Sequence, residues 1–150
     1  MLDEFIEANG LKAEIISCRS EVKTAQAVCD LLKIPLDLVI KTILFIDSKK
    51  EPVLAILLGN DKVSEEKLCR ICKADSVRIA EPDEVSGITG YEAGGVPPVS
   101  IYGVRTVMDK KVQGKEFVVG GGGDEWHLLK ISPKEIEENV EGIIIEDIAE

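Results

Sequence analysis

The sequence is poor in aromatic residues and has no long apolar run. Aromatic residues make up 4% of the chain while hydrophobic residues make up 45%, so we expect a core of Val, Ile and Leu. No segment approaches the roughly 20 consecutive apolar residues that cross a membrane, and the N-terminal MLDEFIEANG lacks the basic start and apolar centre of a signal peptide. We therefore expect a cytoplasmic protein with no membrane partner.

Positive charge is also scarce. The chain has 18 Lys and Arg residues against 28 Asp and Glu residues, which gives a formal net charge of −10. Nonspecific binding to nucleic acid depends on cations that displace counterions from phosphates, so a protein that coats DNA or RNA is excluded and no DNA partner is expected. The local cluster Arg105, Lys110, Lys111 and Lys115 fits either a small patch for the end of an RNA or an ordinary solvated loop.

Cysteines are few and do not form a metal-binding pattern. Cys69 and Cys72 form one C-x-x-C pair, while Cys18 and Cys29 stand apart. A structural zinc site needs four ligands, and no second close pair of Cys or His is present. We expect no metal and no cofactor, and we interpret the thiols as small core residues in a reducing compartment.

Two neighbouring apolar runs predict the centre of a sheet. Residues 39–46 and 53–58 are rich in aliphatic side chains and are joined by a short polar connection, which is typical of an antiparallel pair. Further strands are expected at 13–18, 77–79, 103–108, 116–119 and 127–131, and helices at 2–9, after Thr24, at 64–73, from residue 81 and after Ser132 in a capping box with Glu135. The tail at 143–148 is apolar enough to pack against the rest of the domain. This order predicts an α+β fold, with residues 1–150 as a single domain and a mixed, largely antiparallel sheet with flanking helices.

The segment 90–100, GYEAGGVPPVS, follows neither a helical nor a strand period. Gly94 and Gly95 allow positive φ and close approach to the backbone, while Pro97 and Pro98 stiffen the exit. The loop is thus predicted to present the N–H groups of Gly94, Gly95 and Val96 to an oxyanion or a carbonyl. The alternative is an ordinary turn rich in Gly and Pro.

Lys41 interrupts the apolar run at 39–46. A buried ammonium needs an anion or a carbonyl as its partner, or else it loses its proton. Lys41 is therefore a candidate for a functional group. The alternatives are a salt bridge to one of the acidic residues or a position on an exposed face of the strand.

The four glycines at 120–123 match neither a phosphate-binding loop nor a dinucleotide fingerprint. We interpret them as a second wall of bare backbone before the chain turns back at 124–127. His127 is the single histidine, and no Ser-His-Asp or Cys-His set is evident, so a hydrogen-bonded structural histidine is favoured. A lysine, two amide-rich loops and no evident nucleophile suit the binding or hydrolysis of a substrate whose own groups assist.

Three segments carry a resemblance to a known family: VIKTILF at 39–45, GYEAGGVPPVS at 90–100 and VGGGGDEWHLLKISPKEI at 119–136. Between about Thr24 and Ile136 the chain resembles the YbaK family, which is related to the editing domain inserted in bacterial prolyl-tRNA synthetases. The resemblance implies an aminoacyl-tRNA deacylase acting in trans on a mischarged tRNA, in particular proline tRNA carrying a small wrong amino acid. Its implied partners are the acceptor end of aminoacyl-tRNA and an aminoacyl-tRNA synthetase.

The resemblance also implies roles for individual residues. Lys41 would hold the substrate's carbonyl or the terminal phosphate, the amides of Gly94, Gly95 and Val96 would stabilise the oxyanion, and a ribose hydroxyl would assist. The residues expected to bind substrate are Thr24, Thr42, Tyr91, Pro97, Pro98, Gly122 and Gly123.

The chain departs from the family pattern at three positions. Ser100 follows Val99 where several members have Leu-Gly, Leu128 replaces an acidic residue, and Thr24 stands where members carry an aromatic residue. These changes leave the amino acid that is removed open. A binding module that holds aminoacyl-RNA ends or nucleotides without turnover is the alternative function, and a hydrolase for another small ester is a third.

Overall fold

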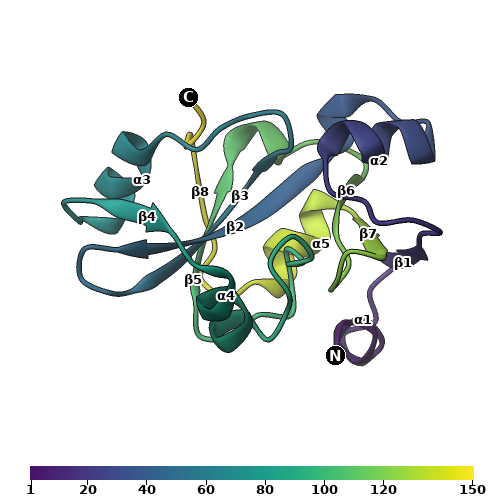
Figure 1. The fold of residues 1–150 in the computed structure, drawn as a ribbon, viewed down its shortest axis with the longest axis horizontal. Coiled ribbons are helices and arrows are strands. Elements are labelled where there is room, and N and C mark those ends of the chain that lie inside the picture. The colour runs from purple at the N-terminus through teal and green to yellow at the C-terminus, as the bar shows by residue number, and fades with distance from the viewer.

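A computed structural model describes all 150 residues as two sheets with five helices around them (Figure 1). The helices are α1 (Leu2–Ala8), α2 (Ala25–Leu32), α3 (Glu65–Cys72), α4 (Pro82–Thr89) and α5 (Pro133–Asn139), with short 3-10 turns η1 (Leu36–Leu38) and η2 (Lys110–Val112). The strands are β1 (Glu14–Ser17), β2 (Ile40–Asp47), β3 (Pro52–Leu58), β4 (Val77–Ile79), β5 (Arg105–Asp109), β6 (Val118–Gly121), β7 (His127–Ile131) and β8 (Ile144–Glu146). None of the helices is long and apolar enough to cross a bilayer.

The larger sheet has the strand order β4-β2-β3-β5-β8, and the smaller sheet has the order β1-β7-β6. The expected pairing of β2 with β3 is antiparallel, with Lys41 opposite Leu57. The smaller sheet is antiparallel throughout, while β5 pairs in parallel with both β3 and β8. The predicted α+β class with a mixed, largely antiparallel arrangement is therefore confirmed.

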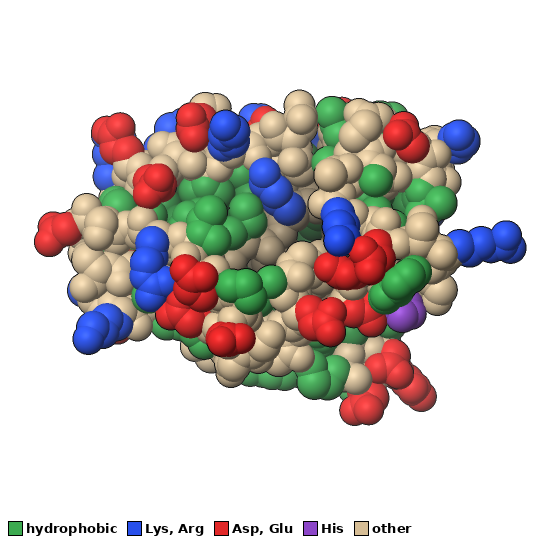
Figure 2. Space-filling model, viewed as in Figure 1, with side chains coloured by type: hydrophobic (Ala, Val, Ile, Leu, Met, Phe, Trp, Pro, Cys, Tyr) green, Lys and Arg blue, Asp and Glu red, His purple; other side chains and the backbone are tan.

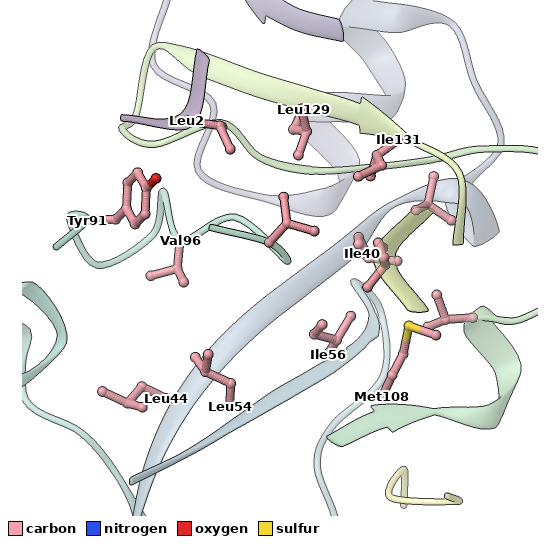
Figure 3. Close-up of a cluster of buried hydrophobic side chains, with 14 of the residues drawn as sticks. Leu2, Ile40, Leu44, Leu54, Ile56, Tyr91, Val96, Met108, Leu129 and Ile131 are labelled. Carbon is pink, nitrogen blue, oxygen red and sulfur yellow. The ribbon is translucent and has the colours of Figure 1, made fainter. Parts of the chain in front are cut away.

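The main core lies between the two sheets and is almost entirely aliphatic. Figure 3 shows side chains of both sheets, such as Ile40 and Leu129, converging on it together with Val96. Val96 and Val99 of the loop at 90–100 are 5% and 1% exposed. Burying each such side chain stabilises the fold by roughly 1.5–3 kcal/mol, so this loop is anchored at its centre by the core.

The glycine run differs from its prediction. The strand expected at 116–119 is β6, which runs on through Gly120 and Gly121. A Cβ on Gly120 would lie 2.9 Å from the Ile40 side chain, and one on Gly121 would press on the Val96 carbonyl. Glycine is needed at both positions of the strand, because β2 and the loop at 90–100 pack so closely against β6 that no side chain would fit.

The helix starts follow the sequence signals with one exception. Thr24 caps α2 by accepting from the Ala27 N–H at 3.0 Å, and Ser132 caps α5 by accepting from the Glu135 N–H at 3.1 Å. The second half of the predicted capping box is missing, because the Glu135 carboxylate accepts from the Lys12 N–H at 2.8 Å instead. Glu135 thus ties the end of the chain to the connection between α1 and β1.

The four thiols are free. Cys29 and Cys72 are buried, while Cys18 and Cys69 are half-buried and pack against apolar clusters. Burial raises the pKa of the Cys72 thiol, which keeps it protonated. The interpretation of the cysteines as small core residues is confirmed.

Candidate active site

A cavity of about 450 Å³ opens where the two sheets meet. Its walls come from the start of α2, the first residues of β2, the turn after β3, the loop at 94–96, and strands β6 and β7. The lining residues are Val22, Lys23, Thr24, Ala25, Gln26, Val28, Val39, Ile40, Lys41, Thr42, Gly59, Asn60, Gly94, Val96, Val119, Gly120, Gly121 and Leu128.

The cavity exists because one edge of β2 is only partly paired. β4 pairs with β2 at residues 45–47 alone, so the edge at residues 40–42 has no partner within its own sheet. A single bridge joins Val39 to Val119 of the smaller sheet. Gly59 lets the start of α2 pack closely against the end of β3, since a Cβ on Gly59 would lie 2.8 Å from the Ala25 Cβ. The sheet edge and the start of α2 therefore frame one concave site.

Lys41 lines this cavity without a partner inside the protein. Its side chain lies on the same face of β2 as those of Ile43 and Phe45. Its ammonium makes no ion pair or hydrogen bond within the chain. Burial lowers the pKa of Lys41, the Asp61 carboxylate opposes this shift, and the Lys62 charge adds to it. The salt bridge considered as an alternative is not formed, and Lys41 offers a half-buried cation to the cavity.

Two backbone amides of the loop face no acceptor. The N–H groups of Gly94 and Val96, both of which line the cavity, donate no hydrogen bond within the chain. Gly94 has φ +88, in the region that favours glycine. The N–H of Gly95 differs from the expectation, because it donates to the Glu92 carbonyl at 3.0 Å. The amides left for a ligand are therefore those of Gly94 and Val96.

Gly95 holds the loop in place. Its carbonyl accepts from the Gly123 N–H at 2.7 Å, and a Cβ on Gly95 would lie 2.5 Å from the Asp124 backbone. The loop is thus fastened to the connection between β6 and β7. Gly122 and Gly123 lie in that connection and outside the cavity lining, so in this structure they support the loop from behind.

Thr24 and Thr42 both line the cavity. The Thr24 hydroxyl oxygen is engaged as the cap of α2. The Thr42 hydroxyl is buried and has no hydrogen-bond partner. An unsatisfied buried hydroxyl costs about 1–3 kcal/mol, which marks Thr42 as a residue that the fold alone does not explain.

Three further residues expected at the site lie elsewhere. Tyr91 is 6% exposed in the main core and donates from its hydroxyl to Ser100 Oγ at 2.7 Å. Pro97 and Pro98 are buried, and none of the three lines the cavity. Tyr91 instead borders a separate hollow beside Gly123 and His127. In the structure these buried residues fix the conformation of the loop at 90–100.

His127 is held by Asp124, with Nδ1 and Oδ1 2.7 Å apart. This contact lowers the pKa of Asp124. Ser17 lies opposite His127 in the β1–β7 register, but no hydrogen bond joins the two. The N–H groups of Gly122 and Gly123 beside them are occupied by backbone carbonyls. The histidine is therefore hydrogen-bonded, as the sequence favoured, and it lies outside the cavity.

Three of the four cations in the expected cluster pair with neighbouring carboxylates, and the fourth, Lys110, is exposed and unpaired. Lys111 pairs with Asp61, Lys115 with Asp37 and Arg105 with Glu51, at 2.5, 3.7 and 3.6 Å. Figure 2 shows acidic and basic groups interspersed on the face it presents. The cluster is not a free basic patch.

Some cavity residues had no role in the sequence prediction. Lys23 at the start of α2 and Asn60 after β3 are examples. The triplet Gly59-Asn60-Asp61 directly after an apolar run is a turn signal, and it could have marked the end of a strand as a site.

Comparison with known proteins places these observations in a family. A family model described as an aminoacyl-tRNA editing domain matches residues 19–138. Proline–tRNA ligase from Streptococcus thermophilus is 38% identical over 114 residues, and that from Fervidobacterium nodosum is 32% identical over 112 residues. These matches cover 75% and 74% of this chain but only 18% and 19% of the ligases, so the chain spans less than a fifth of their length.

Two solved structures share the whole fold. The crystal structure of the hypothetical protein APE2540 has a TM-score of 0.91 at 29% identity, and the alignment covers 99% of both chains. A structure described as a proposed trans-editing enzyme for prolyl tRNA synthetase has a TM-score of 0.89 at 24% identity, with 99% of this chain and 94% of the other covered. At that identity the second likeness shows the fold alone.

Proposed function

This chain belongs to the aminoacyl-tRNA editing domain family, and we propose that residues 1–150 form one domain that acts in trans as an aminoacyl-tRNA deacylase. Its substrate would be a mischarged tRNA, with proline tRNA carrying a small wrong amino acid as the first candidate. The matches to proline–tRNA ligases support this choice of tRNA. The acceptor end of the tRNA is the proposed partner, with the synthetase as a second one.

One observation carries the proposal. A single cavity brings together an unpaired ammonium, from Lys41, and two unpaired amides, from Gly94 and Val96. Groups of this kind bind an ester carbonyl or a phosphate and stabilise the negative charge that develops during ester hydrolysis. The volume of about 450 Å³ lies within the range of small-molecule pockets and suits an aminoacyl group on a terminal ribose.

The proposed reaction needs no nucleophile from the protein. Water adds to the ester carbonyl, and the amides of Gly94 and Val96 bind the resulting oxyanion. The carbon–oxygen bond to the ribose then breaks, and the ribose oxygen takes up one proton of the attacking water. The other proton is released to solvent, and the amino acid leaves as its carboxylate. Lys41 would hold the carbonyl or the terminal phosphate, and the neighbouring ribose hydroxyl would orient the water. Preorganised amide donors of this kind contribute about 3 kcal/mol each.

A panel of charged tRNAs tests the function. We expect release of the amino acid from at least one of alanyl-, cysteinyl- and seryl-tRNA, measured with both proline tRNA and each cognate tRNA. Binding without release across the panel would favour a non-catalytic module for aminoacyl-RNA ends. Equal efficiency on simple esters of the same amino acids would favour a hydrolase for which the tRNA is irrelevant.

Thr42→Val separates a binding role from a structural one. The substitution keeps the branched shape and removes a buried hydroxyl that has no partner, so the free energy of unfolding should rise by about 1 kcal/mol. If the hydroxyl contacts the substrate, KM for the charged tRNA should rise in the same variant. Both are measured on one preparation, by chemical denaturation and by deacylation kinetics.

Thr106→Val is the matched control for this pair of measurements. Thr106 is 3% exposed and its hydroxyl donates to the Val104 carbonyl at 3.3 Å. This variant should lose about 1 kcal/mol of stability and leave KM unchanged. A loss of stability in Thr42→Val as well would mean that the Thr42 hydroxyl is already satisfied in the free protein.

A further inference from the structure

The turn after β3 brings a carboxylate close to the candidate site. Gly59 and Asn60 line the cavity, and Asp61 follows them directly. The turn is fixed at its start, because the Gly59 N–H donates to the Val39 carbonyl at 2.7 Å and the Asp61 N–H donates to the Leu58 carbonyl at 3.0 Å. Asp61 therefore has a defined place at the rim of the cavity that Lys41 lines.

Asp61 is the carboxylate that acts on Lys41, yet it does not pair with it. The charged groups that influence Lys41 are Asp61 and Lys62, and Asp61 favours the charged form of the lysine. Its Oδ2 atom is buried, has no hydrogen-bond partner of regular geometry, and lies 2.5 Å from the Lys111 ammonium in an ion pair. The carboxylate is thus paired with Lys111, while its charge also acts on Lys41.

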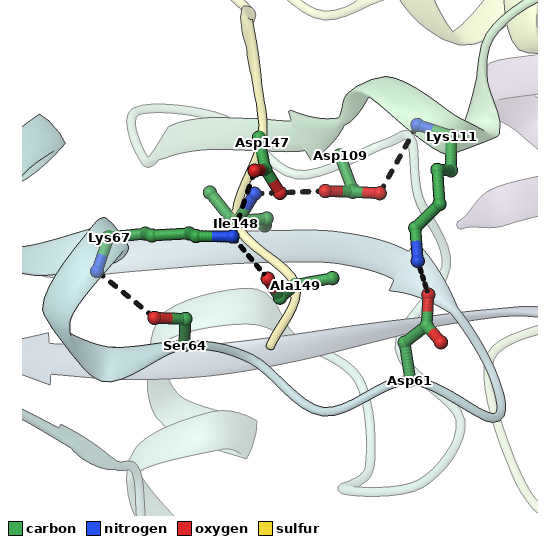
Figure 4. A network of polar contacts seen from close by, with 8 residues as sticks. All are labelled: Asp61, Ser64, Lys67, Asp109, Lys111, Asp147, Ile148 and Ala149. Carbon is green, nitrogen blue, oxygen red and sulfur yellow. Dashed lines mark hydrogen bonds and ion pairs between the residues drawn. The ribbon is translucent and has the colours of Figure 1, made fainter.

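The position of Lys111 is built into the fold. Figure 4 shows Lys111 reaching from η2 to Asp61, while its own N–H donates to Asp109 at 3.2 Å. Asp109 is 1% exposed, and its other oxygen accepts from the Ile148 N–H at 2.9 Å. The C-terminal tail also binds the turn directly, since the Glu150 N–H donates to the Lys62 carbonyl at 2.9 Å. The contact with Asp109 therefore fixes the backbone of Lys111, and the contact with Glu150 fixes the backbone next to Asp61.

We propose that Lys111 is a positioning residue for the deacylation reaction, because by holding the Asp61 carboxylate it keeps the Lys41 ammonium unpaired and available to the substrate. This inference rests on the proposed function, in which Lys41 contacts the substrate. Without Lys111, the Asp61 carboxylate would be free to pair with Lys41. The substrate would then compete with an internal ion pair for the same ammonium.

Kinetics of substituted proteins test the proposal first. Lys111→Met should lower kcat/KM for deacylation about fivefold, in the range of coupling between neighbouring charges. Lys111→Arg, which keeps the charge, should retain the activity of the unsubstituted protein. The double variant Lys111→Met/Asp61→Asn should recover it, because the neutral amide no longer pairs with Lys41. The matched control is Lys110→Met, since Lys110 is exposed and makes no ion pair, and it should have no effect.

Titration of the lysine side chains by NMR gives a readout that needs no tRNA. The pKa of Lys41 should rise in Lys111→Met, because a closer carboxylate favours the charged form, and should fall in Asp61→Asn. A purely structural role for Lys111 would lower the melting temperature of Lys111→Met and leave the pKa of Lys41 in place.

The two proposals fail in different ways. An unchanged pKa of Lys41 in Lys111→Met, or a double variant as impaired as the single one, would overturn the positioning role while deacylation by the unsubstituted protein stood. Absence of release from every charged tRNA would instead remove the proposed function. The titration would still decide whether Lys111 keeps Asp61 away from Lys41.

Discussion

Replacing Lys41 by alanine should lower deacylation at least about tenfold, which corresponds to about 1.4 kcal/mol of transition-state stabilisation. The protein should stay folded, because the Lys41 ammonium makes no internal ion pair or hydrogen bond that the substitution would break. Removal of a half-buried cation should leave the free energy of unfolding unchanged or slightly higher. Deacylation rates and denaturation curves of the same preparation check both statements.

Under the proposed function, the kinetic form of the defect would tell whether Lys41 contacts the phosphate or the ester carbonyl of the substrate. A contact with the terminal phosphate is made equally in the ground state and the transition state, so its loss would raise KM and leave kcat in place. A contact with the ester carbonyl strengthens as charge develops, so its loss would lower kcat. The measurement is a full titration with charged tRNA at a single pH.

Lys23→Ala is the matched control. Lys23 also lines the cavity, but it is 64% exposed and pairs with Glu21 at 3.0 Å. Its loss should change activity by no more than about twofold, as exposed ion pairs contribute 0–1 kcal/mol. Full activity in Lys41→Ala, or equal losses in the two variants, would show that the cavity needs no specific ammonium at residue 41.

Local patterns in the sequence predicted most elements, and they named Lys41 and the loop at 90–100 as candidates that the structure brings to one cavity. The apolar runs at 39–46 and 53–58 are paired strands, and Thr24 and Ser132 cap helices. These features depend on side-chain period and on capping chemistry within a few residues. The same reasoning singles out Lys41, because a cation in an apolar strand needs a partner. The sequence left an internal salt bridge open, and only the structure shows that the chain supplies none.

Features that depend on contacts between distant segments were beyond the sequence. Nothing near Gly95 tells that a Cβ there would meet the backbone of Asp124. Residues far apart in the chain also meet where β5 pairs in parallel with β8 and where the Ile148 N–H donates to the Asp109 carboxylate. Tertiary packing decides which distant segments pair, and it overrides the local secondary-structure propensity of each segment.

Gly95→Ala should lower the free energy of unfolding by about 2 kcal/mol, since overpacking of a close contact costs 1–3 kcal/mol. The new methyl group would lie 2.5 Å from the N and Cα atoms of Asp124, and neither backbone atom can turn aside as a side chain would. Relief of the clash requires the loop to move away from the β6–β7 connection, which stretches the 2.7 Å hydrogen bond from Gly123. Activity should fall at least about tenfold, because a shift near 1 Å in reacting groups can cost about 100-fold.

Gly94→Val distinguishes a blocked site from a displaced loop. A Cβ on Gly94 meets nothing within 4 Å, but its φ of +88 strains a branched side chain, so stability should fall by only about 1–2 kcal/mol. Activity should still fall strongly, because the valine side chain would stand where the substrate approaches the amides. The control for glycine replacement itself is Gly87→Ala on the exposed face of α4, where a Cβ also meets nothing and stability should rise by about 0.5–1 kcal/mol. An undamaged Gly94→Val enzyme would remove the amides from the mechanism, whereas a stable and active Gly95→Ala protein would show that the loop tolerates displacement.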